Sequence, residues 1–250
     1  MNTVAILIDF DNIFPRPIAE YQQSDIENAL QTIISKVRHD NPDADMLTFR
    51  FYGGWYTGNT LTSRASAIGS LLPSLNSIFP IIDLSLSKRI NGTIDLATQL
   101  YGSSYTWYNS YRERPGIPNL RIDSSQMGTA CSVSPDHCPV KILKKFTDKR
   151  NRVCRNTGCT TNHSSVFFEK TQKYVDTMLA CDIISYSLDD DVSAVYVFTD
   201  DVDMFPAFSV SSELPSSRTN LHLLILNDQN EVNYRHLLSA FGVDVSLITL

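Results

Sequence analysis

Near its amino terminus the chain reads Val4-Ala5-Ile6-Leu7-Ile8-Asp9-Phe10-Asp11-Asn12, five aliphatic residues followed at once by acidic and amide side chains. An unbroken aliphatic run is typical of a central parallel strand that helices cover on both faces. In sheets of this kind, ligands bind where the strands end. This stretch therefore predicts an α/β fold and places Asp9 at the ligand-binding edge of its sheet.

Strand-like and helix-like segments alternate along most of the chain. A capping pattern at Ser24 and Glu27, for example, precedes apolar residues at helical spacing. The predicted strands are residues 4–8, 46–52, 78–86, 194–198, 221–226 and 243–250, and the predicted helices are residues 24–37, 62–75, 169–187 and 231–241. This order predicts a mostly parallel sheet with helices on both faces.

The alternation stops between residues 88 and 165, where Gly, Pro, Ser, Asn, Tyr and Cys are mixed without a sustained period. The segment is far longer than an ordinary connection between two elements. We therefore predict a core formed by residues 1–87 and 166–250, with residues 88–165 as an irregular, Cys-rich inserted subdomain.

The composition is that of a globular protein, with 42% hydrophobic residues in 250. No apolar stretch reaches the roughly 18 residues that a membrane-spanning helix needs. The first aliphatic run has no basic flank and meets Asp9 too early for a signal peptide. We expect a cytoplasmic protein that does not bind membranes.

The charge is unevenly distributed. The whole chain carries a net charge of -6, but residues 131–165 hold seven basic and two acidic residues, which gives +5 there and leaves -11 elsewhere. The basic residues are Lys141, Lys144, Lys145, Lys149, Arg150, Arg152 and Arg155. They are candidates for contacts with an RNA backbone; the alternatives are a solvated surface and contact with the acidic core.

Four cysteines lie in the same segment, in the patterns Cys131-x6-Cys138 and Cys154-x4-Cys159. Structural disulfides are disfavoured in the cytoplasm, so two thiol pairs separated by a loop favour a structural Zn²⁺ site. Free thiols and disulfides are the two alternatives, because the spacing within each pair is wider than in common zinc ribbons.

An aromatic cluster precedes the basic segment and consists of Tyr101, Tyr105, Trp107, Tyr108 and Tyr111. Aromatic rings can stack on unpaired bases, and they can equally fill a small core. The two interpretations differ in whether the rings are exposed to solvent.

Four carboxylates are the main candidates for a catalytic site. Asp9 ends the first predicted strand, Asp176 lies in a predicted helix, and Asp201 and Asp203 follow the strand 194–198. Each alone is most often a turn or a helix cap. Together at one edge they match what Mg²⁺ or Mn²⁺ requires, and such ions activate water and neutralise phosphate charge in phosphodiester hydrolysis.

Three segments in this order resemble the NYN family of PIN-like nucleases, which includes the LabA-type proteins. Residues 4–13 are similar to the family's opening strand, residues 173–182 to its Lys-Gly-Val-Asp helix, and residues 197–206 to its Ser-Gly-Asp-x-Asp-Phe-x-Pro element. The resemblance implies a PIN-like fold and an RNA substrate. It also implies metal binding by Asp9, Asp176, Asp201 and Asp203, with Asn12 orienting a ligand or the scissile phosphate.

Other residues in these segments are secondary candidates: Asp11, Asp182, Asp200 and Lys173. Asp182 lies about 120° around the helix from Asp176, so the two should point in different directions. Lys173 is one turn from Asp176 and could contact a phosphate or simply pair with that carboxylate.

The chain departs from the family pattern at three positions: Tyr174 replaces the usual Gly, Asp200 stands where Gly is common, and Met204 replaces Phe. None of these changes removes an expected metal ligand. Residues 92–95 (Gly-Thr-Ile-Asp) are a rival placement for the helical motif, but they are distant in sequence from the strand that should follow it.

The principal hypothesis is therefore a metal-dependent endoribonuclease in which the basic insertion helps to hold RNA. One alternative is a non-catalytic RNA-binding or protein-binding module of the same fold. Another is a nuclease directed at DNA or at a particular nucleic-acid structure. Intact acidic residues favour chemistry, because an acidic cluster repels a phosphate backbone unless a metal is present.

Overall fold

The computed structural model describes residues 1–15, 20–83, 87–115, 139–140, 153, 157–162, 166–214 and 219–250. The chain divides into two compact units. The first consists of Met1–Ser110 and Gln172–Leu250, and the second of Tyr111–Thr171.

The first unit is built on a seven-stranded sheet with the strand order β11-β10-β9-β1-β2-β6-β5. All neighbouring strands are parallel except β5, which pairs antiparallel with β6 at the edge. The strands are β1 (Thr3–Asp9), β2 (Met46–Tyr52), β5 (Ile81–Asp83), β6 (Lys88–Leu96), β9 (Val192–Phe198), β10 (Asn220–Ile225) and β11 (Val243–Leu247). The prediction of an α/β fold with a mostly parallel sheet is confirmed.

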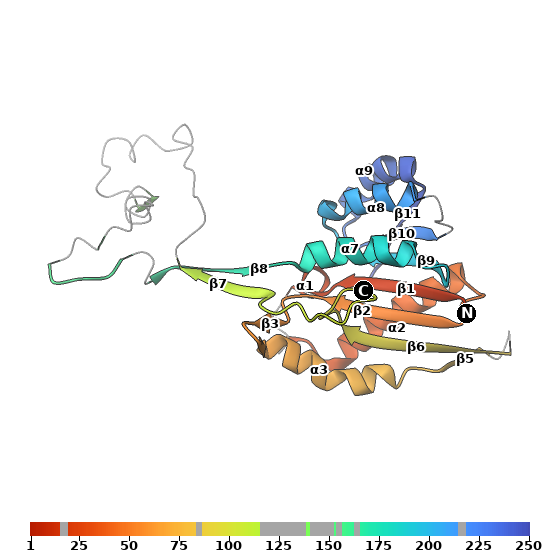
Figure 1. Ribbon diagram of the computed structural model, residues 1–250, viewed down its shortest axis with the longest axis horizontal. Helices are drawn as coiled ribbons and strands as arrows, with labels where there is room; N and C mark the ends of the chain where they lie inside the picture. The colour runs from red at the N-terminus through yellow and green to blue at the C-terminus, as the bar shows by residue number, and fades with distance from the viewer. Residues whose placement is uncertain are drawn as a thin grey trace. The chain divides into compact units, whose positions relative to one another are not determined.

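Helices cover both faces of this sheet (Figure 1). On one face, α2 (Gln23–Asp40) and α3 (Ser63–Asn76) bury their apolar side chains against alternate residues of β1 and β2. On the other face lie α7 (Val175–Ser187), α8 (Phe205–Ser212) and α9 (Asp228–Leu238). The unit also contains the 3₁₀ turns η3 (Val202–Met204) and η4 (Ser239–Phe241) and the short helix α1 (Phe10–Ile13).

The first aliphatic run forms the centre of the sheet, because β1 lies between β2 and β9 and has a helix layer on each face. Residues Val4 to Leu7 are 0% exposed. Complete burial of one such aliphatic side chain is worth about 1.5 to 3 kcal/mol. This burial holds the strand in place up to its last residue, Asp9.

The start of α2 differs from the prediction, and the end of α3 agrees with it closely. The reciprocal cap of α2 is made by Gln22 and Asp25, two residues earlier than the predicted pair Ser24 and Glu27. Helix α3 ends at Asn76, one residue beyond the predicted range 62–75; it contains Pro73, and Leu75 lies in the core.

The division of the chain also differs from the predicted insertion at residues 88–165. Lys88–Leu96 is β6, a strand of the main sheet that pairs with β2. Only Ile90 and Ile94 of this strand are buried, so its composition resembles that of a loop. The rival motif at residues 92–95 lies in this strand and therefore cannot form the helix that the motif requires.

At the other boundary, the predicted helix 169–187 divides into a strand and a helix. Residues Phe168–Gln172 form β8, which pairs with β7 (Tyr111–Pro115) as a two-stranded sheet. Tyr174 then takes a left-handed conformation with φ of 71°, and α7 begins at Val175. A separate small hairpin in the first unit pairs β3 (Tyr56–Thr57) with β4 (Thr60–Leu61).

Among the residues that the structure describes, none of the helices combines the length and apolar character needed to cross a bilayer.

Candidate functional site

The site is organised by the register between β1 and β9. Ile8 pairs with Phe198 in the parallel ladder, so the next residues, Asp9 and Thr199, come side by side at the carboxyl edge. Oδ2 of Asp9 accepts a hydrogen bond from the Thr199 hydroxyl at 3.0 Å. The same oxygen accepts one from Nδ2 of Asn12 at 3.3 Å. The sheet therefore fixes the orientation of the Asp9 carboxylate.

Thr199 was not among the predicted site residues, although its hydroxyl group makes hydrogen bonds with three of them. Its hydroxyl oxygen accepts hydrogen bonds from Nδ2 of Asn12 at 3.2 Å and from the backbone N–H of Asp201 at 3.0 Å. Thr199 is 0% exposed. A polar residue directly after a buried strand, with Asp201 two residues further on, was the sequence feature that could have identified it.

Asp9 is an acid that the fold keeps partly out of water. It is 7% exposed. The pKa of Asp9 is raised from 3.8 to about 6, and burial is the largest cause. The hydrogen bonds from Thr199 and Asn12 lower this pKa, and the charge of Asp176 raises it. Asp9 therefore lies close enough to Asp176 for the two charges to repel each other.

Asp176 lies in the first turn of α7 and brings a second carboxylate to the same edge. Its pKa is raised first by burial and then by the charges of Asp201 and Asp203, while Lys173 lowers it. Acidic residues are favourable at a helix amino terminus, so the helix dipole compensates part of this repulsion. The positive charge of Lys173 lowers the pKa of Asp176. Its role as an ion-pair partner or as a phosphate ligand stays a prediction.

Asp201 and Asp203 come from the loop and the turn that follow β9. Asp201 caps η3, and its Oδ1 accepts a hydrogen bond from the backbone N–H of Asp203 at 2.9 Å. Asp203 is exposed and Asp201 is half-buried. Asp176 is thus within electrostatic range of Asp9, Asp201 and Asp203, and the four residues come from three different elements.

The secondary candidate Asp11 is held by structural contacts. Its Oδ1 pairs with Nε of Arg64 at 2.6 Å, and its Oδ2 accepts a hydrogen bond from the backbone N–H of Gly54 at 3.1 Å. Nε2 of Gln172 donates to the same Oδ2. These contacts tie α1 to α3, to the loop after β2 and to the end of β8.

Asp182 lies in the core and not at the carboxyl edge. It is 0% exposed, pairs with Arg50 and accepts a hydrogen bond from the hydroxyl of Tyr52. The backbone N–H of Tyr101 donates to its Oδ1 at 2.8 Å. The angular offset from Asp176 that the sequence indicates is thus observed, and its result is a buried ion pair between α7 and β2.

Asp200 connects two loops. Its Oδ1 accepts hydrogen bonds from the backbone N–H groups of Leu226 at 3.1 Å and Asn227 at 3.4 Å. These groups lie between the end of β10 and the start of α9. Asp200 therefore supports the edge of the sheet next to Asp201.

The donor groups at this edge determine which metal ion it could bind. Among the described residues, no three His, Cys, Asp or Glu side chains form a ready coordination group. The donors at the edge are nevertheless all oxygens, which Mg²⁺ and Mn²⁺ prefer. Mg²⁺ is often held by one or two carboxylates and keeps several of its waters, so the chemistry of this set fits either ion.

The predicted zinc site and RNA-binding segment fall largely outside the described residues. Cys131, Cys138 and Cys154 lie there, while Cys159 is described and half-buried. All seven predicted RNA-binding basic residues lie outside as well: Lys141, Lys144, Lys145, Lys149, Arg150, Arg152 and Arg155. Both interpretations stay predictions.

A groove of about 550 Å³ lies along the edge that carries Asp9. Its lining includes Ile13 and Phe14 after β1, Leu226 after β10, and Ile248 after β11. The groove thus follows the carboxyl ends of three strands, on the side of the sheet where α2 packs.

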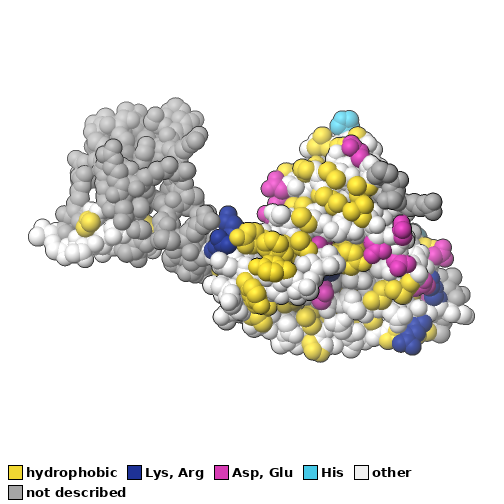
Figure 2. Space-filling model, viewed as in Figure 1, with side chains coloured by type: hydrophobic (Ala, Val, Ile, Leu, Met, Phe, Trp, Pro, Cys, Tyr) yellow, Lys and Arg dark blue, Asp and Glu magenta, His cyan; other side chains and the backbone are white. Residues whose placement is uncertain are grey.

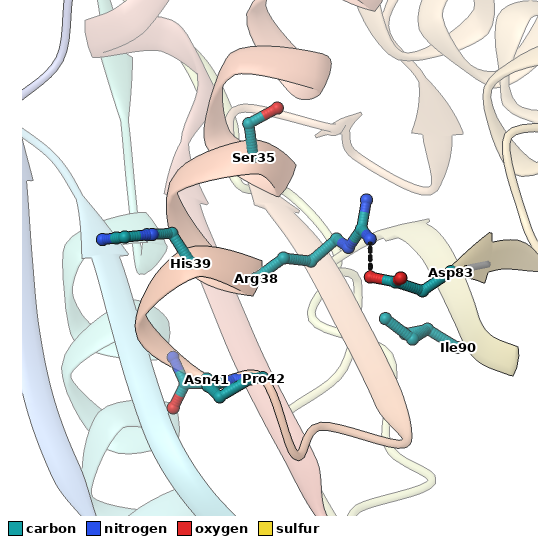
Figure 3. A pocket seen from close by; sticks show the side chains of 7 residues that line it. All are labelled: Ser35, Arg38, His39, Asn41, Pro42, Asp83 and Ile90. Carbon is teal, nitrogen blue, oxygen red and sulfur yellow. Dashed lines mark hydrogen bonds and ion pairs between the residues drawn. The ribbon is translucent and has the colours of Figure 1, made fainter. Parts of the chain in front are cut away.

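Another hollow, of about 290 Å³, lies at the opposite edge of the sheet, where α2 ends. Figure 3 shows Arg38 reaching across it to Asp83 of β5, while His39 points to the other side of the helix. Nη2 of Arg38 is paired with Oδ2 of Asp83. We therefore interpret this hollow as a gap in the packing between α2 and the edge strands of the sheet.

Comparisons of the chain with protein-family models, with curated proteins and with solved structures gave no match. The side chains at the carboxyl edge are therefore the basis on which a function is inferred.

Proposed function

We propose that this protein is a divalent-metal-dependent nuclease of the PIN-like type that hydrolyses RNA. The observation that carries the proposal is the convergence of Asp9, Asp176, Asp201 and Asp203 at one edge, where Asp176 and Asp9 both have raised pKa values. Perturbed carboxylates at the carboxyl edge of a parallel sheet are a frequent mark of a functional site.

The excess of negative charge at this edge of the sheet supports the binding of a metal ion. Four carboxylates meet at this edge, and Lys173 is the basic group that acts on Asp176. Like charges at short range are unfavourable, and a divalent cation would remove this cost. Such an ion supplies a water of lowered pKa and charge stabilisation for the phosphate.

In the proposed site, the side chains have separate roles in binding the metal ion and the phosphate. Asp9, Asp176, Asp201 and Asp203 would hold Mg²⁺ or Mn²⁺ through their oxygens. Asn12 is exposed, and its amide N–H groups donate to Asp9 and Thr199, so in this arrangement it orients the Asp9 carboxylate; a hydrogen bond to a phosphate oxygen would replace one of these two. Lys173 can offer a positive charge to the same phosphate from the start of α7.

A second candidate is a non-catalytic RNA-binding module of the same fold. It is favoured by one observation, that the described acidic residues do not already form a three-ligand coordination group. Such a module would bind RNA without cleaving it in Mn²⁺, whereas the nuclease would cleave RNA in Mn²⁺ and not in EDTA.

The test is a Mn²⁺ titration of purified protein with single-stranded RNA, structured RNA and single-stranded DNA. We expect RNA cleavage that EDTA abolishes and that Asp203→Asn removes while the fold and RNA affinity persist. A matched control is Asp190→Asn, an exposed acid in the turn before β9 at the opposite edge, which should cleave like the wild type. Equal RNA binding in EDTA with no cleavage of any substrate in Mn²⁺ would leave the binding module as the correct function.

A further inference from the structure

Three aromatic rings form a continuous surface next to α7, and we call them the aromatic patch: Tyr105, Trp107 and Tyr174. The rings of Tyr105 and Trp107 have centroids 5.4 Å apart at 79°, and those of Trp107 and Tyr174 are 5.6 Å apart at 52°. Tyr105 is 63% exposed and Tyr174 is 39% exposed. In Figure 2 hydrophobic side chains gather on the surface near the end of the first unit where α7 begins.

The exposure of Tyr105 distinguishes the patch from a small core. Trp107 packs partly against the buried residues beneath α7 and anchors the patch. Tyr101 behaves differently, since it stacks on Tyr186 at 3.8 Å and its hydroxyl donates to Asp189. The rings of the patch meet at steep angles and do not cover one another face to face, so they retain surface for a planar ligand.

Backbone strain indicates that Tyr174 has a role in the patch. Its φ is 71°, a left-handed conformation in which glycine is favoured and a bulky residue is strained. Strain of this kind is concentrated at functional positions. The tyrosine ring, which a glycine would lack, contacts Trp107.

The patch adjoins the carboxylates of the proposed site. Tyr174 directly follows Lys173 and precedes Asp176 by two residues, so the rings and the acidic edge share the start of α7. A strand of RNA whose phosphate lies at Asp176 and Lys173 would carry its next bases toward these rings.

We propose that the aromatic patch binds the unpaired bases of single-stranded RNA beside the cleavage site, an inference that rests on the proposed nuclease function. Stacking of one base on one aromatic side chain is worth about 1 to 3 kcal/mol and tolerates any base sequence. The bases of a duplex are already stacked and paired. The patch therefore selects unpaired RNA.

The experiment measures binding of a 12-nucleotide single-stranded RNA in EDTA, where metal-dependent cleavage cannot occur, and compares it with the same RNA annealed to its complement. The chain has two tryptophans, and Trp55 is only 1% exposed. We expect single-stranded RNA to quench the fluorescence of Trp107 and the duplex to quench it weakly. Trp107→Phe should abolish the quenching.

Tyr105→Leu, which keeps an apolar side chain but removes the ring, should weaken single-strand binding about tenfold. Tyr105→Phe should bind like the wild type. The matched control is Tyr108→Leu: Tyr108 is 44% exposed in the same loop, but its ring packs on Tyr56, and its loss should change affinity less than twofold. Circular dichroism confirms that each variant is folded.

Equal single-strand affinity of Tyr105→Leu and the wild type would overturn the proposal. So would equal binding of duplex and single strand, or an equal loss in Tyr108→Leu. The outcome is separable from that of the nuclease proposal: absence of cleavage in Mn²⁺ rejects the nuclease and leaves the binding result unchanged, whereas normal cleavage with unaltered binding by Tyr105→Leu rejects only the patch.

Discussion

The hydroxyl of Thr199 donates a hydrogen bond to Asp9 across the junction between β9 and β1, at 3.0 Å. The two residues are separated by 190 positions in the chain, and the parallel register of the two strands brings them together. The same hydroxyl accepts the backbone N–H of Asp201. One buried threonine therefore links the acid at the end of β1 to the acidic loop after β9.

Replacing Thr199 by valine should loosen this link. Thr199→Val keeps the shape but leaves the N–H of Asp201 without its partner and removes a donor from Asp9. We expect a loss of about 1 to 3 kcal/mol in the free energy of unfolding. Without this donor, which lowers the pKa of Asp9, that pKa should rise further.

Chemical denaturation measures the first effect, and the pH dependence of RNA cleavage measures the second. Thr199→Ser retains the hydroxyl and should restore both. A valine variant with unchanged stability and an unchanged pH profile would show that this hydrogen bond does not position Asp9.

Asp9 should make the metal-free protein less stable as the pH rises. Its pKa in the folded state is about 6, above the value of 3.8 for a free side chain, so the folded protein binds the proton more tightly. The protein is fully stabilised by this effect below pH 4 and loses it as the pH passes 6. The shift corresponds to about 3 kcal/mol at neutral pH.

Asp9→Asn should therefore raise the free energy of unfolding in EDTA by about 1 to 3 kcal/mol at pH 7.5 and change it little at pH 4. Urea denaturation at the two pH values is the measurement. A gain that is the same at both values would show that ionisation of Asp9 is not its cause.

The fold was predictable where strands carry continuous apolar runs, as at residues 4–8 of β1 and residues 194–198 of β9. It was not predictable at β6, where only Ile90 and Ile94 of nine residues are buried, because an outer strand does not need a continuous apolar sequence. Nor could sequence show that Tyr174 interrupts the predicted helix 169–187, since a positive φ is unusual for tyrosine.

At the candidate site, the order of strands and helices along the chain was enough to predict that four carboxylates lie at one edge of the sheet: Asp9, Asp176, Asp201 and Asp203. The different surroundings of Asp11, Asp182 and Asp200 depend on partners that are far away in the sequence. Arg50 is 132 residues from Asp182, and Leu226 is 26 residues from Asp200. Only the folded structure identifies such partners, and it thereby shows which acidic residues stabilise the fold.

A divalent ion should stabilise the protein through these four carboxylates. A ligand that binds only the folded state adds about 2.7 kcal/mol at 100 times its Kd. We therefore expect Mn²⁺ to raise the melting temperature of the wild type, and to raise it much less in Asp176→Asn. Thermal denaturation over a Mn²⁺ series is the measurement, with Asp190→Asn as the control that should respond like the wild type. An equal response in Asp176→Asn would place the ion elsewhere.

The buried pair of Arg50 and Asp182 should behave as a structural unit and not as part of the metal site. Arg50 has a side chain that is 8% exposed, and Asp182 is 0% exposed. Removing one partner leaves the other charge buried, which typically costs about 3 to 5 kcal/mol. Asp182→Leu and Arg50→Met should each lower the free energy of unfolding by about this amount.

The double variant Arg50→Met with Asp182→Leu buries no charge at this position. It should therefore recover more than half of the loss of either single variant, as buried pairs replaced by apolar residues often do. Denaturation of the four proteins gives the coupling energy, and the Mn²⁺ response of the folded double variant should equal that of the wild type. Additive losses of stability in the double variant would show that the two charges do not depend on each other. A lost Mn²⁺ response in a stable double variant would show that Asp182 contributes to the metal site.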